Sequence, residues 1–548
     1  MAELTINNKV NEVNGMSNPS NTMRTFTVIV MLLIAAYLLI GGVWLILLGG
    51  SIYYVIAGLL ILASAFLLKR GQGSSLWLYS FLMLATILWS LWEVGSDFWA
   101  LAPRLDVLGV LGLWLLIPAV TRNMSQAQGS KIALSGTLLI AIAVMIYAIF
   151  NDPQEINGVI QQPQPASAQA IDGVAEQDWP AYGRTQGGVR YSPLTQINDQ
   201  NVKNLKVAWT FRTGDVKTDK DSGETTNQVT PIKVGNNLYM CTTHQWLIAL
   251  DPATGKEKWR FDPKLKADHT FQHLTCRGVM YYDANNTAEF ATSLQNRKSV
   301  SAECPRKVIV PVNDGRLVAV NADTGKVCSD FGEQGEVNLQ KFMPYAYPGG
   351  YNPTSPGIIS GTTIVIAGSV TDNYSSKEPS GVIRGYDVNT GELLWVFDTG
   401  AQNPNAMPNE STTFVHNSPN AWAPLAYDAK LDIVYVPTGV GTPDIWGGDR
   451  SELKERYANS MLAINASTGK LVWHFQTTHH DLWDMDVPAQ PSLADVQDAA
   501  GQTVPAIYVL TKTGNVFVLD RRTGKAIVPI TERAVPQARS EEHTSELQ

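Results

Sequence analysis

The chain has 548 residues and a formal net charge of −8 at pH 7, with 41 Lys and Arg against 49 Asp and Glu. That length exceeds one ordinary domain, and an acidic chain without a Lys/Arg stripe excludes nucleic acid as a partner, because phosphate binding depends on clustered cations. Long apolar runs fall almost entirely before Asn151, whereas the remainder is polar and dense in turn residues. The sequence therefore predicts two unlike parts.

Taken in chain order, the first part holds five apolar runs of about membrane-spanning length, at residues 25–48, 52–68, 76–92, 105–120 and 132–150. Each run approaches the ~20 residues that a helix needs to cross a bilayer, and a cleaved signal peptide would show only one such run. Basic residues gather on one side of the predicted spans, at Lys9, Arg24, Lys69, Arg70, Arg122 and Lys131. The positive-inside rule then places residues 1–24 in the cytoplasm and everything after residue 150 outside, which is the periplasm in a bacterial cell.

Residues 151–177 are rich in Gln, Pro, Ala and Ser, a composition typical of a linker. The predicted domains are therefore a membrane domain at 25–150, this linker, a second domain at 178–537 and a tail at 538–548.

All four cysteines lie in the second part, and none forms a Cys-x-x-Cys pair, which does not favour zinc. An oxidising compartment would permit one or two disulfides, with three connectivities for four thiols, and buried free thiols are the alternative. The cysteines are Cys241, Cys276, Cys304 and Cys328.

One pattern recurs after Asp178: an apolar strand-like run, Asp or Asn, two variable residues, Thr-Gly-Lys/Glu, and a Trp four positions after the Gly. Asp or Asn followed by Gly predicts a hairpin, and the Trp offers a flat face for packing between neighbouring units. Repeats of this kind indicate a β-propeller. Full copies occur at 251–259, 387–395 and 465–473, weaker ones at 321–326 and 520–525, and an opening copy ends at Trp209.

Residues 479–486 read His-His-Asp-Leu-Trp-Asp-Met-Asp. In an extended segment Asp484 and Asp486 would point to one side and Trp483 to the other. Neighbouring carboxylates repel one another, so a cation, a metal or a shared proton is expected beside them. The alternative is a solvated acidic turn.

The repeat and several longer motifs resemble the membrane-bound quinoprotein glucose dehydrogenases, which use pyrroloquinoline quinone (PQQ). The resemblance implies an eight-bladed all-β propeller, incomplete here, after a domain of five transmembrane helices. The motifs are Asp178-Trp-Pro-Ala-Tyr-Gly-Arg184, Gly368-Ser-Val-Thr-Asp-Asn373, Gly381-Val-Ile-Arg-Gly385, Asn417-Ser-Pro-Asn-Ala-Trp-Ala-Pro424, Thr442-Pro-Asp-Ile-Trp-Gly447 and the octapeptide above.

By the same resemblance, Asp484 is the general base that takes the proton from the C1 hydroxyl of the sugar as hydride passes to PQQ. Asp372 and Asn373 match ligands for Ca²⁺ or Mg²⁺, and Thr442 is placed near the same ion. Lys512 matches the lysine that hydrogen-bonds the ortho-quinone and stabilises its charge. Read alone, Thr-Asp-Asn-Tyr is a turn and Lys-Thr-Gly-Asn an ordinary hairpin.

Trp422 resembles the indole on which the planar cofactor stacks, with a core aromatic as its alternative. His244 matches a histidine assigned to PQQ or substrate contact, although a single histidine at a strand end is often structural.

The function implied is oxidation of D-glucose and similar aldoses to the lactone in the periplasm, with electrons passing through PQQ to ubiquinone in the bacterial inner membrane. One alternative is a quinate/shikimate or polyol dehydrogenase of the same family. The other, from a different class, is a cofactor-free propeller that serves as a scaffold.

Only five or six blades fit between Asp178 and Gln537, and residues 539–548 have no counterpart in the family. We therefore expect a truncated sequence with a non-native tail. The 548-residue chain is expected to show no dehydrogenase activity after PQQ and Ca²⁺ are added, and turnover of glucose by it would refute this.

Overall fold

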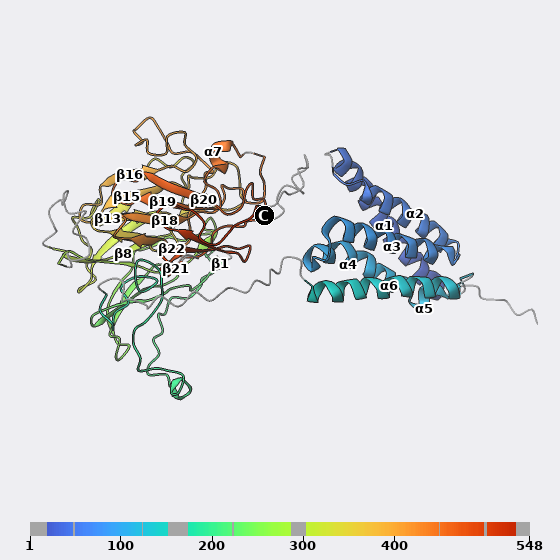
Figure 1. Ribbon diagram of the computed structural model, residues 1–548, viewed down its shortest axis with the longest axis horizontal. Helices are drawn as coiled ribbons and strands as arrows, with labels where there is room; N and C mark the ends of the chain where they lie inside the picture. Colours follow the sequence, from blue (N-terminus) through green and yellow to red (C-terminus); the bar gives the residue numbers. More distant parts are fainter. Residues whose placement is uncertain are drawn as a thin grey trace, which may run out of the picture. The chain divides into compact units, whose positions relative to one another are not determined.

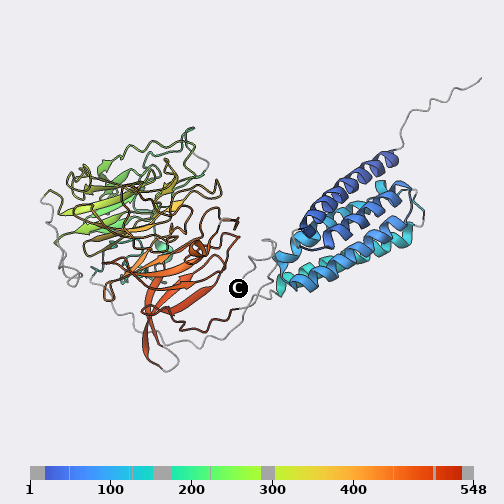
Figure 2. The ribbon, with the colours of Figure 1, turned by 90° about the horizontal axis from the view of Figure 1, so that it is seen from above.

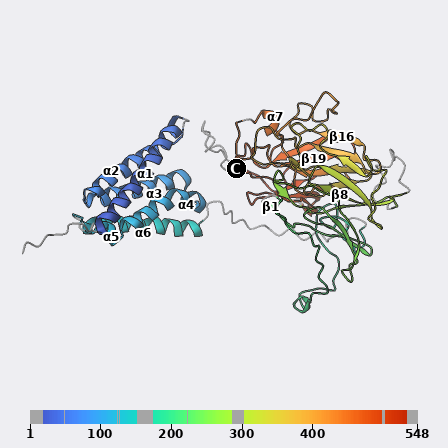
Figure 3. The same ribbon diagram turned by 180° about the vertical axis from the view of Figure 1, so that it is seen from behind.

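The chain forms two compact units, a helical one before residue 152 and a β-rich one after residue 173 (Figures 1, 2 and 3). The computed structural model describes residues 19–47, 50–122, 124–125, 127–151, 174–221, 224–285, 303–448, 450–497 and 501–532. Most of the predicted linker and all of the predicted tail lie outside these residues.

The helical unit packs apolar helices around a core that includes Met31, Ile61, Met83 and Leu134. Within the described residues, four helices are long and apolar enough to cross a membrane, namely α1, α3, α4 and α6, and α2 is a shorter apolar helix. The helices are α1 Pro19–Leu47, α2 Tyr53–Lys69, α3 Ser74–Val94, α4 Phe98–Leu115, α5 Pro118–Thr121 and α6 Ala127–Phe150.

The prediction of a span at 105–120 was wrong in its bounds, because α4 begins seven residues earlier and ends at Leu115. Asp97 caps the helix by accepting hydrogen bonds from the backbone N–H groups of Trp99 (2.9 Å) and Ala100 (3.2 Å). Apolar composition missed this start because Arg104 interrupts the run. In the structure Arg104 pairs with Glu93 of α3 at 3.0 Å, so its charge is neutralised where the two helices meet.

The β-rich unit consists mainly of four-stranded antiparallel sheets in which strands that follow one another in the chain lie side by side. The first two are β2 Ile232–Val234, β3 Asn237–Cys241, β4 Leu247–Leu250, β5 Glu257–Phe261; and β7 Met280–Asp283, β8 Arg306–Val312, β9 Arg316–Asn321, β10 Glu336–Asn338. The next two are β12 Ile358–Ser360, β13 Thr363–Ile366, β15 Ile383–Asp387, β16 Leu393–Phe397; and β17 Ala426–Asp428, β18 Ile433–Pro437, β19 Ser460–Asn465, β20 Leu471–Gln476.

A three-stranded sheet follows, with β21 Ser492–Gln497, β22 Thr503–Leu510 and β23 Val516–Asp520. Short elements complete the described part: β1 Glu224–Thr225 pairs in parallel with β6 His273–Leu274, β11 Tyr351–Asn352 pairs with β14 Ser369–Val370, and η1 Val202–Asn204 and α7 Glu452–Glu455 are single turns. The apolar faces of successive sheets share cores, as where Val310 of β8 and Tyr239 of β3 belong to one cluster. This is the face-to-face packing of propeller blades.

The repeated Thr-Gly turn is the docking point for the tryptophan of the preceding sheet. Trp395 donates a hydrogen bond from Nε1 to the carbonyl oxygen of Ala466 at 2.9 Å, and its ring lies against Gly469. The other pairs repeat this geometry: Trp209 with Pro252 and Gly255, Trp259 with Ala322 and Gly325, and Trp473 with Arg521 and Gly524. The predicted packing role of the repeat tryptophan is confirmed.

Replacing Gly469 by alanine is expected to destabilise the β-rich unit by at least about 2 kcal/mol. Its φ of 71° suits glycine, and an added Cβ would lie 2.5 Å from the Trp395 ring. Thermal unfolding followed by near-UV circular dichroism measures the loss. Gly501 has a similar φ but open space around it, so Gly501→Ala controls for backbone strain alone. An equal effect of both changes would contradict the docking argument.

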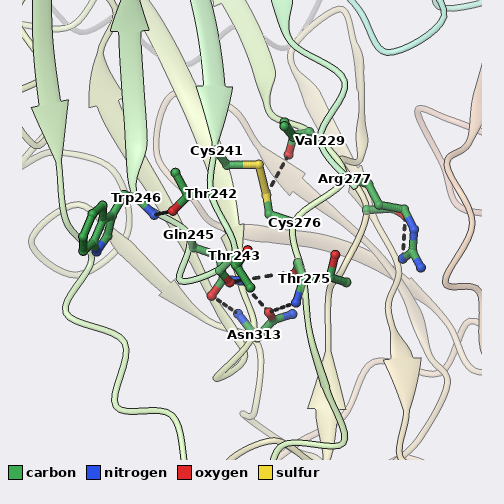
Figure 4. Close-up of a disulfide and its surroundings, with 12 residues drawn as sticks. Val229, Cys241, Thr242, Thr243, Gln245, Trp246, Thr275, Cys276, Arg277 and Asn313 are labelled. Carbon is green, nitrogen blue, oxygen red and sulfur yellow. Dashed lines mark hydrogen bonds between the residues drawn. A yellow bond between two sulfur atoms is a disulfide. The ribbon is translucent and has the colours of Figure 1, made fainter. Parts of the chain in front are cut away.

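The cysteines form two disulfides, Cys241–Cys276 and Cys304–Cys328, which decides between the alternatives left open by the sequence. The first joins the end of β3 to the segment after β6. Figure 4 shows this disulfide beside Gln245, Thr275 and Asn313.

Candidate active site

The side chain of Lys512 brings two of the acidic residues together. Lys512 lies in the turn between β22 and β23, and its Nζ is 2.9 Å from Asp484 Oδ1 and 3.1 Å from Asp486 Oδ2. The expected cation beside these carboxylates is therefore a lysine that precedes the β23 strand by a few residues.

The acidic octapeptide is a looped segment and not the extended one predicted. His480 and Asp484 have φ angles of 47° and 58°, which breaks the alternation of side chains along a strand. The side chain of Asp481 stabilises the loop, because it accepts hydrogen bonds from the backbone N–H groups of Trp483 (2.8 Å) and Met485 (2.5 Å). Asp484 and Asp486 thus converge on one cation because the chain turns between them.

The two carboxylates have different surroundings. Asp486 accepts hydrogen bonds from Trp422 Nε1 (2.8 Å) and the Val440 N–H (3.1 Å), and its side chain is 9% exposed. Asp484 forms an ion pair with Lys512, and its side chain is 43% exposed. Burial, and then the charge of Asp486, raise the pKa of Asp484 to about 6, although Lys512 opposes the rise.

The indole of Trp422 is approached by two cations. The guanidinium carbon of Arg277 lies 5.1 Å from the ring centroid, and Lys512 Nζ lies 5.7 Å from it. Arg277 follows Cys276 directly, so the first disulfide anchors the segment that carries it (Figure 4). Trp422, Lys512 and Asp484, predicted from distant motifs, therefore meet at one place.

The three residues predicted to bind a metal lie on adjoining loops. Asn373 Oδ1 accepts a hydrogen bond from the Ile445 N–H at 3.2 Å, which joins the loop after β14 to the loop that follows Thr442. Thr442 Oγ1 accepts from Asn417 Nδ2 at 3.0 Å. The described residues contain no group of three His, Cys, Asp or Glu side chains arranged to hold a metal, so the predicted ligand set depends on the neutral oxygens of Asn and Thr.

Asp444 is a site residue that the sequence analysis missed, although it lies within the Thr442–Gly447 motif. Burial, and then the nearby charges of Asp372, Asp486 and Asp484, raise the pKa of Asp444 to about 9. Asp444 interacts with Asp372, a predicted metal ligand, and with Asp484, the predicted base. The carboxyl groups of Asp372, Asp444, Asp484 and Asp486 therefore form one acidic cluster. Asp444 is the only acidic residue of that motif, and this could have marked it as a site residue.

His273, at β6, was also missed. Its Nε2 lies 3.1 Å from Asp372 Oδ2, and its Nδ1 lies 2.6 Å from Glu224 Oε2. The hydrogen bond to Asp372 raises the pKa of His273. No motif in the sequence marked this histidine, because the contact exists only after β1 and β6 pair.

His244 is placed between two buried carboxylates. Its Nδ1 contacts Asp215, its backbone N–H donates to Asp215 Oδ2 at 2.8 Å, and its Nε2 lies 3.2 Å from Asp221 Oδ1. These contacts join the 215–221 segment to the turn after β3, whereas its predicted contact with PQQ or substrate stays a prediction.

His244 is expected to make stability depend on pH. Hydrogen bonding to Asp215 is the largest cause that raises the pKa of His244 to about 9, from an ordinary 6.5. Because the pKa of His244 is higher in the folded protein than in the unfolded chain, protonated His244 stabilises the fold fully below pH 6.5. That stabilisation is lost as pH rises through 9. Because water partly screens the pair, we expect His244→Gln to cost on the order of 1–2 kcal/mol at pH 6 and much less at pH 9.5. Denaturant unfolding at the two pH values measures this, and a cost independent of pH would contradict it.

A propeller with docked tryptophans and a lysine, acid and indole at one site is the architecture of a quinoprotein dehydrogenase. Residues 179–548 match the family model for the PQQ glucose/ethanol/alcohol dehydrogenase β-propeller domain. The chain belongs to this family.

Its relatives include quinoprotein glucose dehydrogenase A of Acinetobacter calcoaceticus, 78% identical over 95% of this chain, and quinoprotein glucose dehydrogenase of Escherichia coli, 58% identical over 94%. The chain spans 65% and 63% of the lengths of these two proteins. Among solved structures, the quinohemoprotein alcohol dehydrogenase from Comamonas testosteroni superposes with a TM-score of 0.51 at 26% identity, over 67% of this chain and 52% of that one.

Proposed function

We propose that the protein oxidises D-glucose and related aldoses to the lactone with PQQ as cofactor, at the outer face of a bacterial inner membrane, and passes the electrons to ubiquinone. The observation that carries this proposal is the position of Lys512, between the carboxylates of Asp484 and Asp486 and beside the indole of Trp422. The identity to two glucose dehydrogenases favours an aldose over quinate, shikimate or a polyol.

The residues around Trp422 fit a flat, acidic quinone. Arg277 and Lys512 supply two positive charges at an aromatic surface, which suits a planar ligand with carboxylates. Thr275 lies two residues before Arg277 and donates its backbone N–H to Asn313 Oδ1, and two buried atoms of this pair, Thr275 Oγ1 and Asn313 Nδ2, have no hydrogen-bond partner among the described residues. When bound, PQQ supplies an ortho-quinone that accepts a hydride.

The acidic cluster fits a divalent cation. Asp372, Asn373 and Thr442 offer oxygen donors of the kind that Ca²⁺ and Mg²⁺ prefer, and Asp444 adds a fourth. Burial, and then the charges of Asp372, Asp486 and Asp484, raise the pKa of Asp444, so a cation bound among these carboxylates would favour its ionised form. We propose these four residues as the ligand set for Ca²⁺ or Mg²⁺.

Asp484 and Asp486 have different roles in the proposed site. Asp484, accessible and with a pKa of about 6, is suited to take the proton of the substrate hydroxyl at neutral pH. Asp486, held by Trp422, Val440 and Lys512, fixes the indole and the ammonium group in place. Lys512 keeps Asp484 ionised and presents a positive charge where negative charge develops.

We further infer that the whole protein has eight blades and five membrane spans, with residues 1–24 in the cytoplasm. The proposed division is 25–150 for the membrane domain, 151–177 for the linker, 178–537 for the periplasmic propeller and 538–548 for a non-native tail. The excess of basic residues at 69, 70, 122 and 131 supports this orientation.

The test compares the 548-residue chain with a chain extended to the length of its relatives. Each is titrated with PQQ in the presence of Ca²⁺, followed by tryptophan fluorescence, and then assayed with glucose or quinate and a dye acceptor. We expect the extended chain to bind PQQ and oxidise glucose, and the 548-residue chain to be inactive. No binding by the extended chain would favour the scaffold alternative, and faster turnover of quinate would overturn the sugar assignment.

A further inference from the structure

The guanidinium group of Arg450 connects two loops of the site. Its Nη2 donates to the carbonyl oxygens of Asp444 (2.6 Å) and Pro443 (3.1 Å), and its Nη1 donates to the carbonyl oxygen of Asp481. The first loop carries Asp444, and the second carries Asp484. The Arg450 side chain therefore joins the loop that carries Asp444 to the segment that holds the proposed base.

This connection matters because neither loop is part of a sheet. The 479–486 segment has its own internal support, in which Asp481 accepts hydrogen bonds from Trp483, Met485 and Asn459. That support shapes one loop, and the contacts that reach the other loop are the hydrogen bonds of Arg450 and, at the far end of the segment, the Val440 N–H that donates to Asp486 Oδ1 at 3.1 Å. Arg450 binds the Asp481 backbone at the same residue, so it holds an already shaped loop against its neighbour.

The environment of Arg450 makes the link specific to arginine. Its side chain is 4% exposed, and Glu455 lies 3.8 Å from Nη1, which balances the buried charge. A planar guanidinium presents several donors in a fixed fork and can serve three carbonyls at once, whereas an ammonium is a point charge on a flexible stem.

We propose that Arg450 is a positioning residue, whose hydrogen bonds to Pro443, Asp444 and Asp481 set the separation between the Asp444 loop and the loop that carries Asp484. The inference deepens the proposed function and rests on it for the chemical role of Asp484. The placement of the loops can be tested without cofactor or sugar.

The test uses the full 548-residue chain in detergent and the variants Arg450→Ala and Arg450→Lys. Backbone hydrogen exchange is read by mass spectrometry on peptides from both loops and from β15–β16. We expect exchange in both loops to rise about tenfold, since charge-assisted hydrogen bonds are lost, with β15–β16 unchanged. Added guanidinium ion, at a concentration that leaves the wild type folded, is expected to restore protection in Arg450→Ala.

A second measurement reads the site directly. Acetic anhydride acetylates the unprotonated amine of Lys512, so the rate of acetylation across pH reports how much of this amine is free. Burial lowers the pKa of Lys512, but the charges of Asp486 and Asp484 outweigh it and raise the pKa. When the loop moves, Asp484 leaves Lys512, so Lys512 should be acetylated several-fold faster below pH 10, with exposed Lys470 as the internal reference. Guanidinium ion should reverse this change too.

Arg456→Lys is the control for Arg450→Lys, because Arg456 is exposed and its guanidinium carbon lies 5.5 Å from the Tyr457 ring. Exchange that rises throughout the β-rich unit, or in one loop only, would overturn the proposal, as would acetylation of Lys512 at the wild-type rate. If Arg450→Ala does not fold, Arg450→Lys decides by the same criteria. Failure of PQQ to bind would count against the proposed function alone.

Discussion

Replacing Asp484 by asparagine is expected to lower turnover of glucose by about 10²–10⁴-fold in a chain extended to the length of its relatives, the usual contribution of a general base. Asparagine keeps the shape of the side chain but cannot take a proton. Because the pKa of Asp484 is raised to about 6, wild-type turnover should fall as pH drops through 6 and should be fully present well above it. Steady-state assays with a dye acceptor across pH measure both effects.

The control is Asp323→Asn, which removes a half-exposed carboxylate paired with Arg306 at 2.6 Å on the surface. It should leave turnover unchanged. PQQ affinity of Asp484→Asn should also stay close to wild type, since Asp484 does not contact the indole. Wild-type turnover by Asp484→Asn would remove this residue from the mechanism.

Replacing Lys512 by methionine is expected to have the second largest effect. Asp484 and Asp486 would lose the cation that contacts both, and their mutual repulsion would raise the pKa of Asp484 further. The base would then be protonated at pH 7, and the acid limb of the pH profile should move upward. Together with the loss of a positive charge at the site, we expect turnover at pH 7 to fall by about 10²-fold or more.

Lys470→Met serves as the control, because Lys470 is exposed in the hairpin after β19. The same pH series in both variants separates the two effects of Lys512. An acid limb that stays near pH 6 in Lys512→Met would show that Lys512 does not govern Asp484. A loss of turnover with no change in the limb would assign Lys512 a role in stabilising charge alone.

The site was partly predictable because long motifs mark several of its residues. Asp484, Lys512 and Trp422 come from separate segments, and the structure brings them within one cluster. Asp444 was overlooked inside a motif that had already been noticed. His273 and Arg277 carried no pattern of their own, and their roles follow from contacts made by β6 and by a disulfide.

The helical unit shows where composition stops being informative. Hydropathy located the apolar helices, since membrane-spanning helices need long apolar runs. It misplaced the start of α4, because a cap at Asp97 and an ion pair between Arg104 and Glu93 allow polar residues within the helix. Both features depend on neighbours in space.

By itself the sequence determined the two-part organisation, the hairpin repeat and a packing role for its tryptophan, because these depend on composition, local turns and short-range periodicity. The tertiary structure alone decided which carboxylates share Lys512, how the cysteines pair and where His244 lies. Such contacts join residues tens of positions or more apart in the chain, and their energies depend on burial and distance, which no local pattern encodes.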